Sequence, residues 1–268
     1  MKFKPPIPHE HGAWAMLYAP MIIAVAVLGR FELSVTLFLI ATTTIFLAHE
    51  PLSVLVKLNP KRPSSPQIFR ESKWWLAIYS TIAIAATVPL LLHYQRWWLA
   101  PFGVVLLVLL SAHIYLASKR EERTIGGELL GVISLTLTAP SAYYVLTGKL
   151  DQFCLLLWAL NVVYFTSSIF YVKMRVSRFA KKKDANALTW QCLGYHMLLA
   201  AGIGALLWMN WITGVAALAF LPITLRTFAG LKEEKGKLNL KHIGIAETVY
   251  TLLFIIFLGW GLSTTLSA

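Results

Sequence analysis

The stretch WWLAIYSTIAIAATVPLLLH, residues 74–93, decides the fold of this chain. It contains no Lys, Arg, Asp or Glu, and its length matches the roughly 20 mostly apolar residues that a helix needs to cross a bilayer. Because backbone groups in lipid must bond internally, we expect an all-α polytopic membrane protein with nine transmembrane helices. The expected spans are residues 12–29, 31–49, 74–93, 97–117, 125–147, 152–172, 188–208, 211–226 and 243–265.

The composition agrees with a membrane protein. Hydrophobic residues make up 57% of the chain and charged residues 13%, and the mean hydropathy is +0.66. These values are too apolar for a soluble domain of this length. The formal net charge of +12 would indicate a nucleic-acid partner in a soluble protein, but at a bilayer such cations orient the chain and face anionic lipid. We therefore expect membrane lipid as a partner and no nucleic acid.

The Lys and Arg residues predict the orientation. If the N-terminus is cytoplasmic, all of the 24 Lys and Arg residues except Arg30, Arg96 and Lys149 fall on the cytoplasmic side. Cytoplasmic connectors of membrane proteins carry such an excess of cations. We therefore expect a multi-pass protein of the inner (plasma) membrane, with the N-terminus in the cytoplasm and the C-terminus outside.

The chain is expected to form a single transmembrane domain over residues 1–268. No connector is longer than about 25 residues, and none has the Gly- and Ser-rich composition of a flexible linker. The polar and proline-rich residues 5–11 separate the N-terminal cations from the first apolar run, so we expect no cleaved secretory signal. Cys154 and Cys192 lie at opposite membrane sides in this topology, so we expect no disulfide between them.

Ionisable residues gather at the expected cytoplasmic ends of the spans, where each needs a partner, water or a ligand. Glu50, Glu128 and Glu247 are the candidate catalytic residues. Glu50 directly precedes Pro51, at which we expect the second helix to end, whereas Glu128 and Glu247 lie a few residues inside apolar runs. The candidate substrate-binding residues are His11, His49, Arg62, Tyr171, Lys173 and Arg175. We expect one cytoplasm-proximal polar cavity to collect His49, Glu50, Glu128, Lys173, Arg175 and Glu247.

Several motifs along the chain resemble those of known membrane proteins. They are PHEHGAWAMLYAP at 8–20, GGELLG at 126–131, YYVLTG at 143–148 and DANALTWQCLG at 184–194. Together with the order of the spans, they resemble the UbiA-type membrane prenyltransferases. The PHEHGAW start followed by His-Glu-Pro at 49–51 more specifically resembles the YwiC-like family. The resemblance implies a UbiA-like helical bundle that binds or modifies an isoprenoid, a quinone or a similar amphipathic anionic substrate.

The chain departs from the prenyltransferase pattern at the metal site. Those enzymes hold Mg²⁺ on two aspartate-rich clusters, which lets a diphosphate leave. This chain contains two aspartates in total, Asp151 and Asp184. The clusters are replaced by HEPLSVLVK at 49–57 and SSIFYVKMRVSR at 167–178. We therefore expect no conventional two-cluster Mg²⁺ site, assign no metal ligand, and leave the cofactor unknown.

Two mechanisms remain open at this point. In the first, cations such as Arg62, Lys173 and Arg175 bind a phosphate, diphosphate or carboxylate headgroup, with Glu50 or Glu247 as base or counter-charge. In the second, histidines bind a transition metal or haem iron, because imidazole is a better ligand for these metals than for Mg²⁺. These histidines are His9, His11, His49 and His242.

Three classes of function remain open as well. The protein is a membrane transferase acting on an amphipathic substrate, a non-enzymatic carrier of a lipid, quinone or haem, or a transporter or assembly factor for an ionic solute. A transporter would need polar residues at the outer ends of the spans. Few occur there, which argues against that class.

Overall fold

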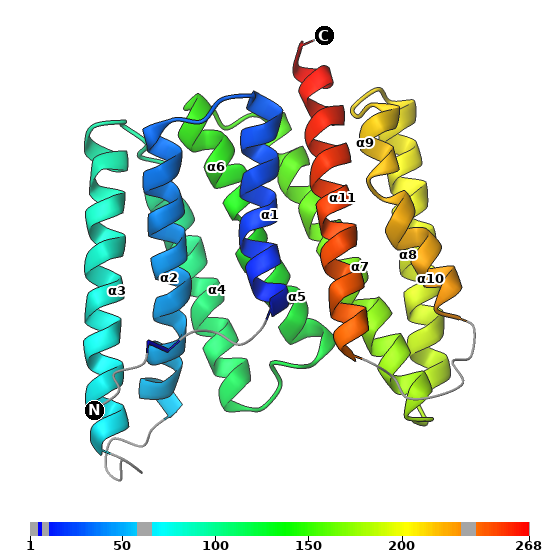
Figure 1. Cartoon of the computed structure of the whole chain (residues 1–268), viewed down its shortest axis with the longest axis horizontal. Coiled ribbons are helices and arrows are strands. Elements are labelled where there is room, and N and C mark those ends of the chain that lie inside the picture. Colours follow the sequence, from blue (N-terminus) through cyan, green and yellow to red (C-terminus); the bar gives the residue numbers. More distant parts are fainter. Residues whose placement is uncertain (1–4, 7–10, 58–65, 232–239, 268) are drawn as a thin grey trace. The chain divides into compact units, whose positions relative to one another are not determined.

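We analysed a computed structural model of the chain, which describes residues 5–6, 11–57, 66–231 and 240–267 (Figure 1). The described residues form α-helices and no strand. The helices are α1 (His11–Leu28), α2 (Leu33–Lys57), α3 (Pro66–Leu92), α4 (Leu99–Ser118), α5 (Ile125–Thr136), α6 (Thr138–Thr147), α7 (Gln152–Phe179), α8 (Ala185–Trp208), α9 (Gly214–Leu218), α10 (Leu221–Ala229) and α11 (Leu240–Ser267).

Seven helical segments in the described parts of the chain are long and apolar enough to cross a membrane, counting α5 and α6 as one segment. Two shorter apolar segments, Gly12–Leu28 and Gly214–Ala229, occupy the places of the first and eighth expected spans. The prediction of an all-α polytopic membrane protein is therefore confirmed. A UbiA-like arrangement of the helices stays a prediction.

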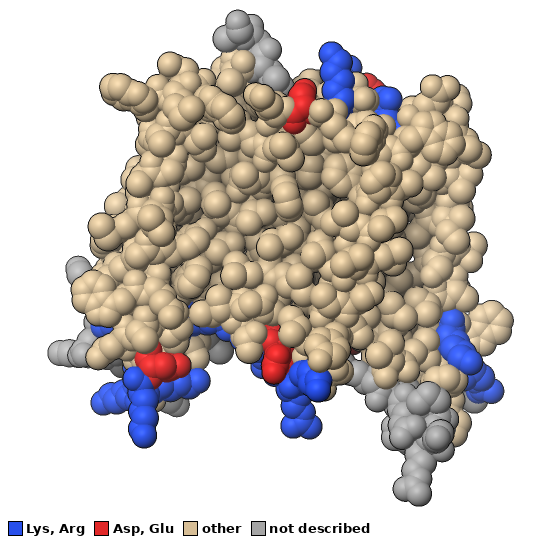
Figure 2. All heavy atoms as spheres, turned by 180° about the vertical axis from the view of Figure 1, so that it is seen from behind, with Lys and Arg blue, Asp and Glu red and all other residues tan. Residues whose placement is uncertain are grey.

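The surface of the helices fits a lipid environment. Large apolar side chains such as Val104, Leu107 and Val108 on α4 are more than half exposed, which a soluble protein would avoid over a continuous surface. On the face in Figure 2, the Lys, Arg, Asp and Glu side chains lie along the upper and lower margins, and the broad surface between them carries none of these residues. Charged residues are costly in the middle of a bilayer, so this distribution follows from burial in lipid.

The ends of several helices differ from the expected ones. The expectation that Pro51 ends the second helix is wrong, because α2 continues through Pro51 to Lys57. A proline removes one backbone hydrogen bond, and helices in membranes tolerate this loss because neighbouring groups satisfy the freed carbonyl. Glu50 therefore lies inside α2. Likewise, α7 continues to Phe179, so Lys173 lies within the helix, past the last residue of the expected span.

The chain divides into two compact units. Among the described residues, unit 1 lies within 5–11, 31–134 and 141–150, and unit 2 lies within 12–30, 135–140 and 151–267. In unit 1, α2 packs against α3 and α4. In unit 2, α7 packs against α8, α9 packs against α11, and α10 packs against α7, α8 and α9. The single transmembrane domain stays a prediction.

Helical spacing of buried residues explains the packing in unit 1. Val35, Phe38 and Ala41 are buried on α2, and Ala83 and Ala86 are buried on α3. Residues three or four positions apart lie on one face of a helix, and small residues let helices in a membrane approach closely. The two helices therefore present a matching pair of apolar faces.

An aromatic cluster forms the core of unit 2 beside the site described below. Tyr164 of α7 stacks on Phe254 of α11, with ring centroids 3.6 Å apart. Phe220 contacts both rings edge to face, with centroids at 6.3 and 5.5 Å. These rings are almost fully buried. The cluster thus packs α7 and α11 against Phe220, which directly precedes α10. This packing holds the three helices that carry the polar side chains of the site.

Candidate functional site

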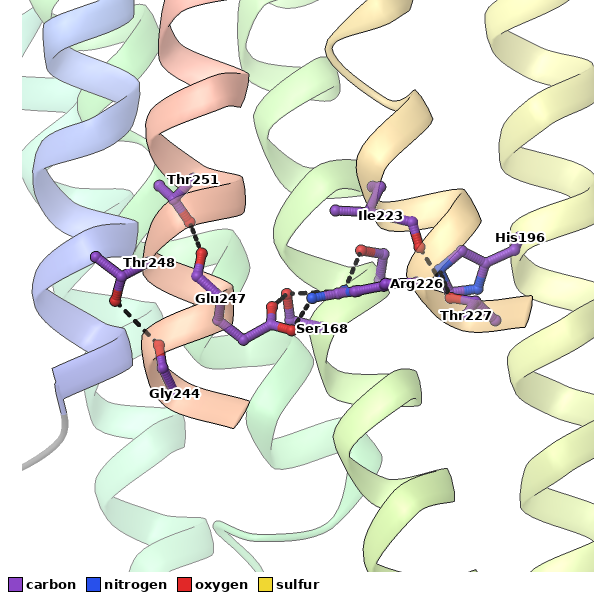
Figure 3. A network of polar contacts seen from close by, with 10 residues as sticks. Ser168, His196, Ile223, Arg226, Thr227, Gly244, Glu247, Thr248 and Thr251 are labelled. Atoms are coloured by element: carbon purple, nitrogen blue, oxygen red, sulfur yellow. Dashed lines mark hydrogen bonds and ion pairs between the residues drawn. The ribbon is translucent and has the colours of Figure 1, made fainter. Parts of the chain in front are cut away.

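A buried ion pair in unit 2 is the most unusual polar feature of this structure. Nη1 of Arg226 on α10 pairs with Oε1 of Glu247 on α11. The side chain of Arg226 is 3% exposed and that of Glu247 is 20% exposed. Figure 3 shows the guanidinium pointing from α10 toward the carboxylate on α11. Ionisable groups inside a membrane protein persist where they pair, and such pairs mark functional sites.

Two serines of α7 complete the polar contacts of this pair. Ser168 donates a hydrogen bond of 2.7 Å to Oε2 of Glu247. Nη2 of Arg226 donates to the hydroxyls of Ser167 at 3.2 Å and Ser168 at 3.4 Å. Ser168 therefore bridges the acid and the base, as Figure 3 shows. Three helices, α7, α10 and α11, meet at one charged cluster.

Two tyrosine rings also hold the guanidinium. Its Cζ lies 4.5 Å from the ring centroid of Tyr171 and 5.5 Å from that of Tyr250. A cation over an aromatic ring is attracted by the ring's negative face. Nε of Arg226 is buried and has no hydrogen-bond partner among the described residues. Several contacts thus hold the guanidinium, and its Nε has no acceptor in the part of the chain that the structure describes.

On the other side of α10, a buried histidine positions the residue next to Arg226. Nε2 of His196, on α8, lies 2.9 Å from the hydroxyl of Thr227, and Nδ1 lies 2.8 Å from the carbonyl of Cys192. A carbonyl can only accept a hydrogen bond, so we assign the proton to Nδ1. His196 is 2% exposed, and Figure 3 shows its ring directed at Thr227. This contact connects α8 to the helix that carries Arg226.

Arginines of α7 bind the carboxyl end of α10. Nη1 of Arg175 donates to the carbonyl of Gly230 at 3.1 Å, and Nη2 of Arg178 donates to the carbonyl of Leu231 at 2.8 Å. The last carbonyls of a helix lack partners within the helix, so cations there stabilise its end. Arg175 therefore has a structural contact at the end of α10. Its predicted role in substrate binding stays a prediction.

The remaining predicted residues lie in both units. Tyr171, Lys173 and Glu247 belong to unit 2, where Tyr171 and Glu247 meet at Arg226. His49, Glu50 and Glu128 belong to unit 1. Arg62 and the side chain of His11 lie outside the described residues. Convergence of His49, Glu50, Glu128, Lys173, Arg175 and Glu247 on one cavity therefore stays a prediction.

A second, smaller polar contact occurs in unit 1. The rings of His49 on α2 and His113 on α4 lie 5.6 Å apart between centroids, and Nε2 of His49 lies 3.3 Å from the hydroxyl of Ser53. Glu50 and Glu128 are half-buried. A surface depression on α3, lined by Arg70, Lys73, Trp74 and Ala77, contains none of the predicted residues.

The residues do not fit a conventional prenyltransferase metal site. Within the described ranges, no group of three or more His, Cys, Asp and Glu side chains could hold a metal ion. Ser168 and Tyr171, which belong to the segment in the place of the second acidic cluster, contact Arg226 instead. Asp184, which follows that segment, accepts a hydrogen bond of 2.6 Å from Ser177.

Sequence reasoning identified Glu247 and Tyr171 but missed Arg226 and His196. Arg226 belongs to the excess of cations on the expected cytoplasmic side, so its charge did not by itself indicate a buried partner. The available signal was its position at the end of an apolar span, four residues after Pro222. His196 carried a similar signal, since it lies in the middle of the apolar residues 188–208. An ionisable side chain well inside an apolar run indicates a buried partner.

Comparison with known proteins identifies the family. Residues 7–143 match the model of the family described as YwiC-like protein, which is more than half of the 268 residues. A Bacillus subtilis (strain 168) protein described as "Uncharacterized protein YwiC" is 27% identical over 249 residues, which cover 93% of this chain and 95% of the relative. A Haemophilus influenzae (strain ATCC 51907 / DSM 11121 / KW20 / Rd) protein described as "Uncharacterized protein" is 23% identical over 252 residues, covering 94% and 96% of the two chains. No solved structure matches at a significant level. The chain therefore belongs to the YwiC-like protein family.

Proposed function

We propose that this membrane protein binds an amphipathic molecule with an anionic headgroup, and that Arg226 contacts the headgroup. The ligand class is an isoprenoid, a quinone-like compound or a similar lipid that carries a phosphate or carboxylate. The observation that carries the proposal is the buried Arg226–Glu247 pair with its bridging serines in unit 2. We further propose a single transmembrane domain with a UbiA-like arrangement of helices.

The chemistry of the guanidinium favours an oxyanion. Arginine stays charged under all physiological conditions and presents planar donors that match carboxylate and phosphate oxygens. At Arg226, Nε has no protein acceptor among the described residues, and Nη2 reaches only neutral hydroxyls at 3.2 and 3.4 Å. A charged oxygen forms a stronger hydrogen bond than a hydroxyl does. An oxyanion at Arg226 would therefore bind donors that the described residues use only weakly.

The surroundings of Arg226 favour an apolar tail on the ligand. Helices α7, α10 and α11 belong to segments that are apolar enough for a membrane, and exposed apolar side chains such as Leu225, Phe228 and Ile245 flank the pair along the chain. A lipid tail can remain in the bilayer while its headgroup reaches the arginine. Lys173 lies on the same helix as Ser168 and Tyr171, and we propose that it attracts the same headgroup.

The proposed roles of the three glutamates differ. Glu247 already contacts Arg226, so it is the proposed base or counter-charge of the headgroup site. We retain Glu50 and Glu128 of unit 1 as proposed catalytic acids or bases. A carrier or a transporter would use the same Arg226 site without them, so substitutions of Glu50 and Glu128 separate catalysis from binding.

The test is direct binding to the full-length protein purified in detergent. The probes are farnesyl phosphate and farnesoate, with farnesol as the uncharged control, and native mass spectrometry identifies lipids that purify with the protein. We expect both anions to bind and farnesol not to bind. The variant Arg226→Gln/Glu247→Gln, which removes the pair without leaving a lone charge, should weaken anion binding at least about tenfold, because a charged hydrogen bond contributes about 1.5–3 kcal/mol.

The matched control is Lys182→Gln, which removes an exposed cation from the same unit. It should bind the anions as the wild type does. Equal affinity of the wild type and the double variant, or equal binding of farnesol and the anions, would overturn the proposed function.

A further inference from the structure

The two members of the buried pair are held unequally. Arg226 is 3% exposed and contacts two hydroxyls and two aromatic rings in addition to Glu247. Glu247 is 20% exposed, and its carboxylate contacts Ser168 and Arg226. Arg226 is therefore the fixed member of the pair, and Glu247 is the member whose carboxylate can leave.

An anion that binds Arg226 must compete with the Glu247 carboxylate, which already pairs with the guanidinium. One guanidinium carries one positive charge, so two anions beside it leave a net negative charge in a low-dielectric environment, where repulsion is strong. A displaced carboxylate without a cation is also costly inside a membrane protein. Binding a proton removes that cost, because the neutral carboxyl needs only hydrogen-bond partners, such as Ser168.

We propose that anion binding at Arg226 is coupled to the protonation of Glu247, with one proton taken up for each anion bound. This inference rests on the proposed function and adds its regulation. The anion replaces the carboxylate on the guanidinium, and the proton comes from the aqueous phase and adds to a carboxylate oxygen of Glu247. The net charge of the site is the same before and after it takes up one anion and one proton, so binding is electroneutral.

The other titratable groups near Glu247 come from α11 and four other helices. On α10 the group is Arg226, and on α7 the groups are Tyr164 and Tyr171, beside the neutral Ser168. Through Thr227, α10 contacts His196 and, next to it, Cys192 of α8. Helix α1 contacts α11 at Ala26 and Gly259 and carries Tyr18. Helix α11 itself carries Lys241, His242 and Tyr250. Of these, His196 and His242 are the groups that compete with Glu247 as the proton acceptor.

Isothermal titration calorimetry tests the coupling on the wild-type protein in detergent. The probe is farnesyl sulfonate, because its charge does not change near neutral pH. Titrations in buffers of different ionisation enthalpy give the number of protons taken up per probe bound. We expect about one proton for the wild type and a dissociation constant that rises about tenfold per pH unit, as linkage requires for one coupled proton.

The variant Glu247→Gln should bind the probe more tightly than the wild type, take up no proton and show no pH dependence. The controls His242→Gln and Glu121→Gln, at two exposed positions, should behave as the wild type does. Probe binding without proton uptake by the wild type would overturn this inference and leave the proposed function intact. Proton uptake that persists in Glu247→Gln would also overturn it, since another group would then be the acceptor. Absence of probe binding at every pH would overturn the proposed function, and this inference with it.

Discussion

At the scale of single residues, the site depends on pairs that lie far apart in the sequence. The positive-inside rule accounts for the charge of Arg226 without requiring a partner, whereas the position of Glu247 inside an apolar run indicated a buried contact. The helices bring Glu247, Ser168 and Arg226 together from α11, α7 and α10. Sequence patterns predict that an ionisable group needs a partner, but they do not identify the partner.

We predict that Arg226 and Glu247 are strongly coupled in stability. Arg226→Gln should lower the free energy of unfolding by about 3–5 kcal/mol, because it leaves a buried carboxylate without its cation. Adding Glu247→Gln to that variant should restore part of the loss, since no lone charge remains. The measurement is a double-mutant cycle from unfolding with sodium dodecyl sulfate in mixed micelles.

A second cycle on the exposed residues Lys182 and Glu121 is the control. Exposed charges contribute little to stability because water and salt screen them, so that cycle should give a coupling energy close to zero. Additive effects of Arg226→Gln and Glu247→Gln would contradict the ion pair.

At the scale of helices, hydropathy predicted which segments are helical but not where each helix ends. Apolar runs mark the part of a helix that lies in lipid, whereas α3 and α7 extend into polar sequence at Pro66 and Phe179. Two expected spans are each divided into two helices, at Leu137 between α5 and α6 and at Ala219–Phe220 between α9 and α10. Pro140 and Pro222 follow these interruptions closely, which fits the lost backbone bonds of proline.

We predict that Gly261→Ala disrupts the packing of α11 on α9. A Cβ atom at Gly261 would lie 2.6 Å from Cα and 2.7 Å from Cβ of Ala216, and backbone atoms cannot move aside as a flexible side chain can. Thr213 also donates a hydrogen bond of 2.9 Å to the carbonyl of Gly261. The unfolding free energy in mixed micelles should fall by about 1–3 kcal/mol, the usual cost of overpacking.

The matched control is Gly204→Ala in α8, where the added methyl group would have no described atom within 4 Å beyond its chain neighbours and the adjacent backbone of its own helix. That variant should be unchanged or more stable by up to about 1 kcal/mol, since alanine favours a helix. Equal stability of the two variants would show that α9 and α11 do not approach closely at Gly261.

At the scale of the whole molecule, the cation distribution carries a prediction about topology. All Lys and Arg residues except Arg30, Arg96 and Lys149 belong to the side that we expect to be cytoplasmic. Alkaline phosphatase fused after Ala268 should therefore be active in a bacterial host, and green fluorescent protein fused there should not fluoresce. Fusions after Lys182 should behave in the opposite way. The reverse pattern at both positions would invert the topology.

The distribution of acidic residues over the whole chain bears on Mg²⁺-dependent prenyl transfer. We expect no conventional Mg²⁺-dependent prenyl transfer, because a departing diphosphate develops charge that several metal-bound carboxylates normally help to neutralise. The two aspartates already have local contacts: Asp151 accepts a hydrogen bond of 3.0 Å from the backbone of Cys154 at the start of α7, and Asp184 accepts one from Ser177. Only Glu50 lies near the place of the first acidic cluster, and cations such as Lys173 occupy the place of the second.

The measurement is product formation from geranyl, farnesyl and longer polyprenyl diphosphates with aromatic acceptors, with and without Mg²⁺. Under the proposed function, Arg226 binds an anionic headgroup without activating it, so we expect these diphosphates to bind while no prenylated product forms. The control is a prenyltransferase that carries both aspartate-rich clusters, assayed in the same micelles. Metal-dependent product that disappears in Glu50→Gln would show that a single carboxylate is sufficient to activate the leaving group, and it would make this membrane protein an enzyme.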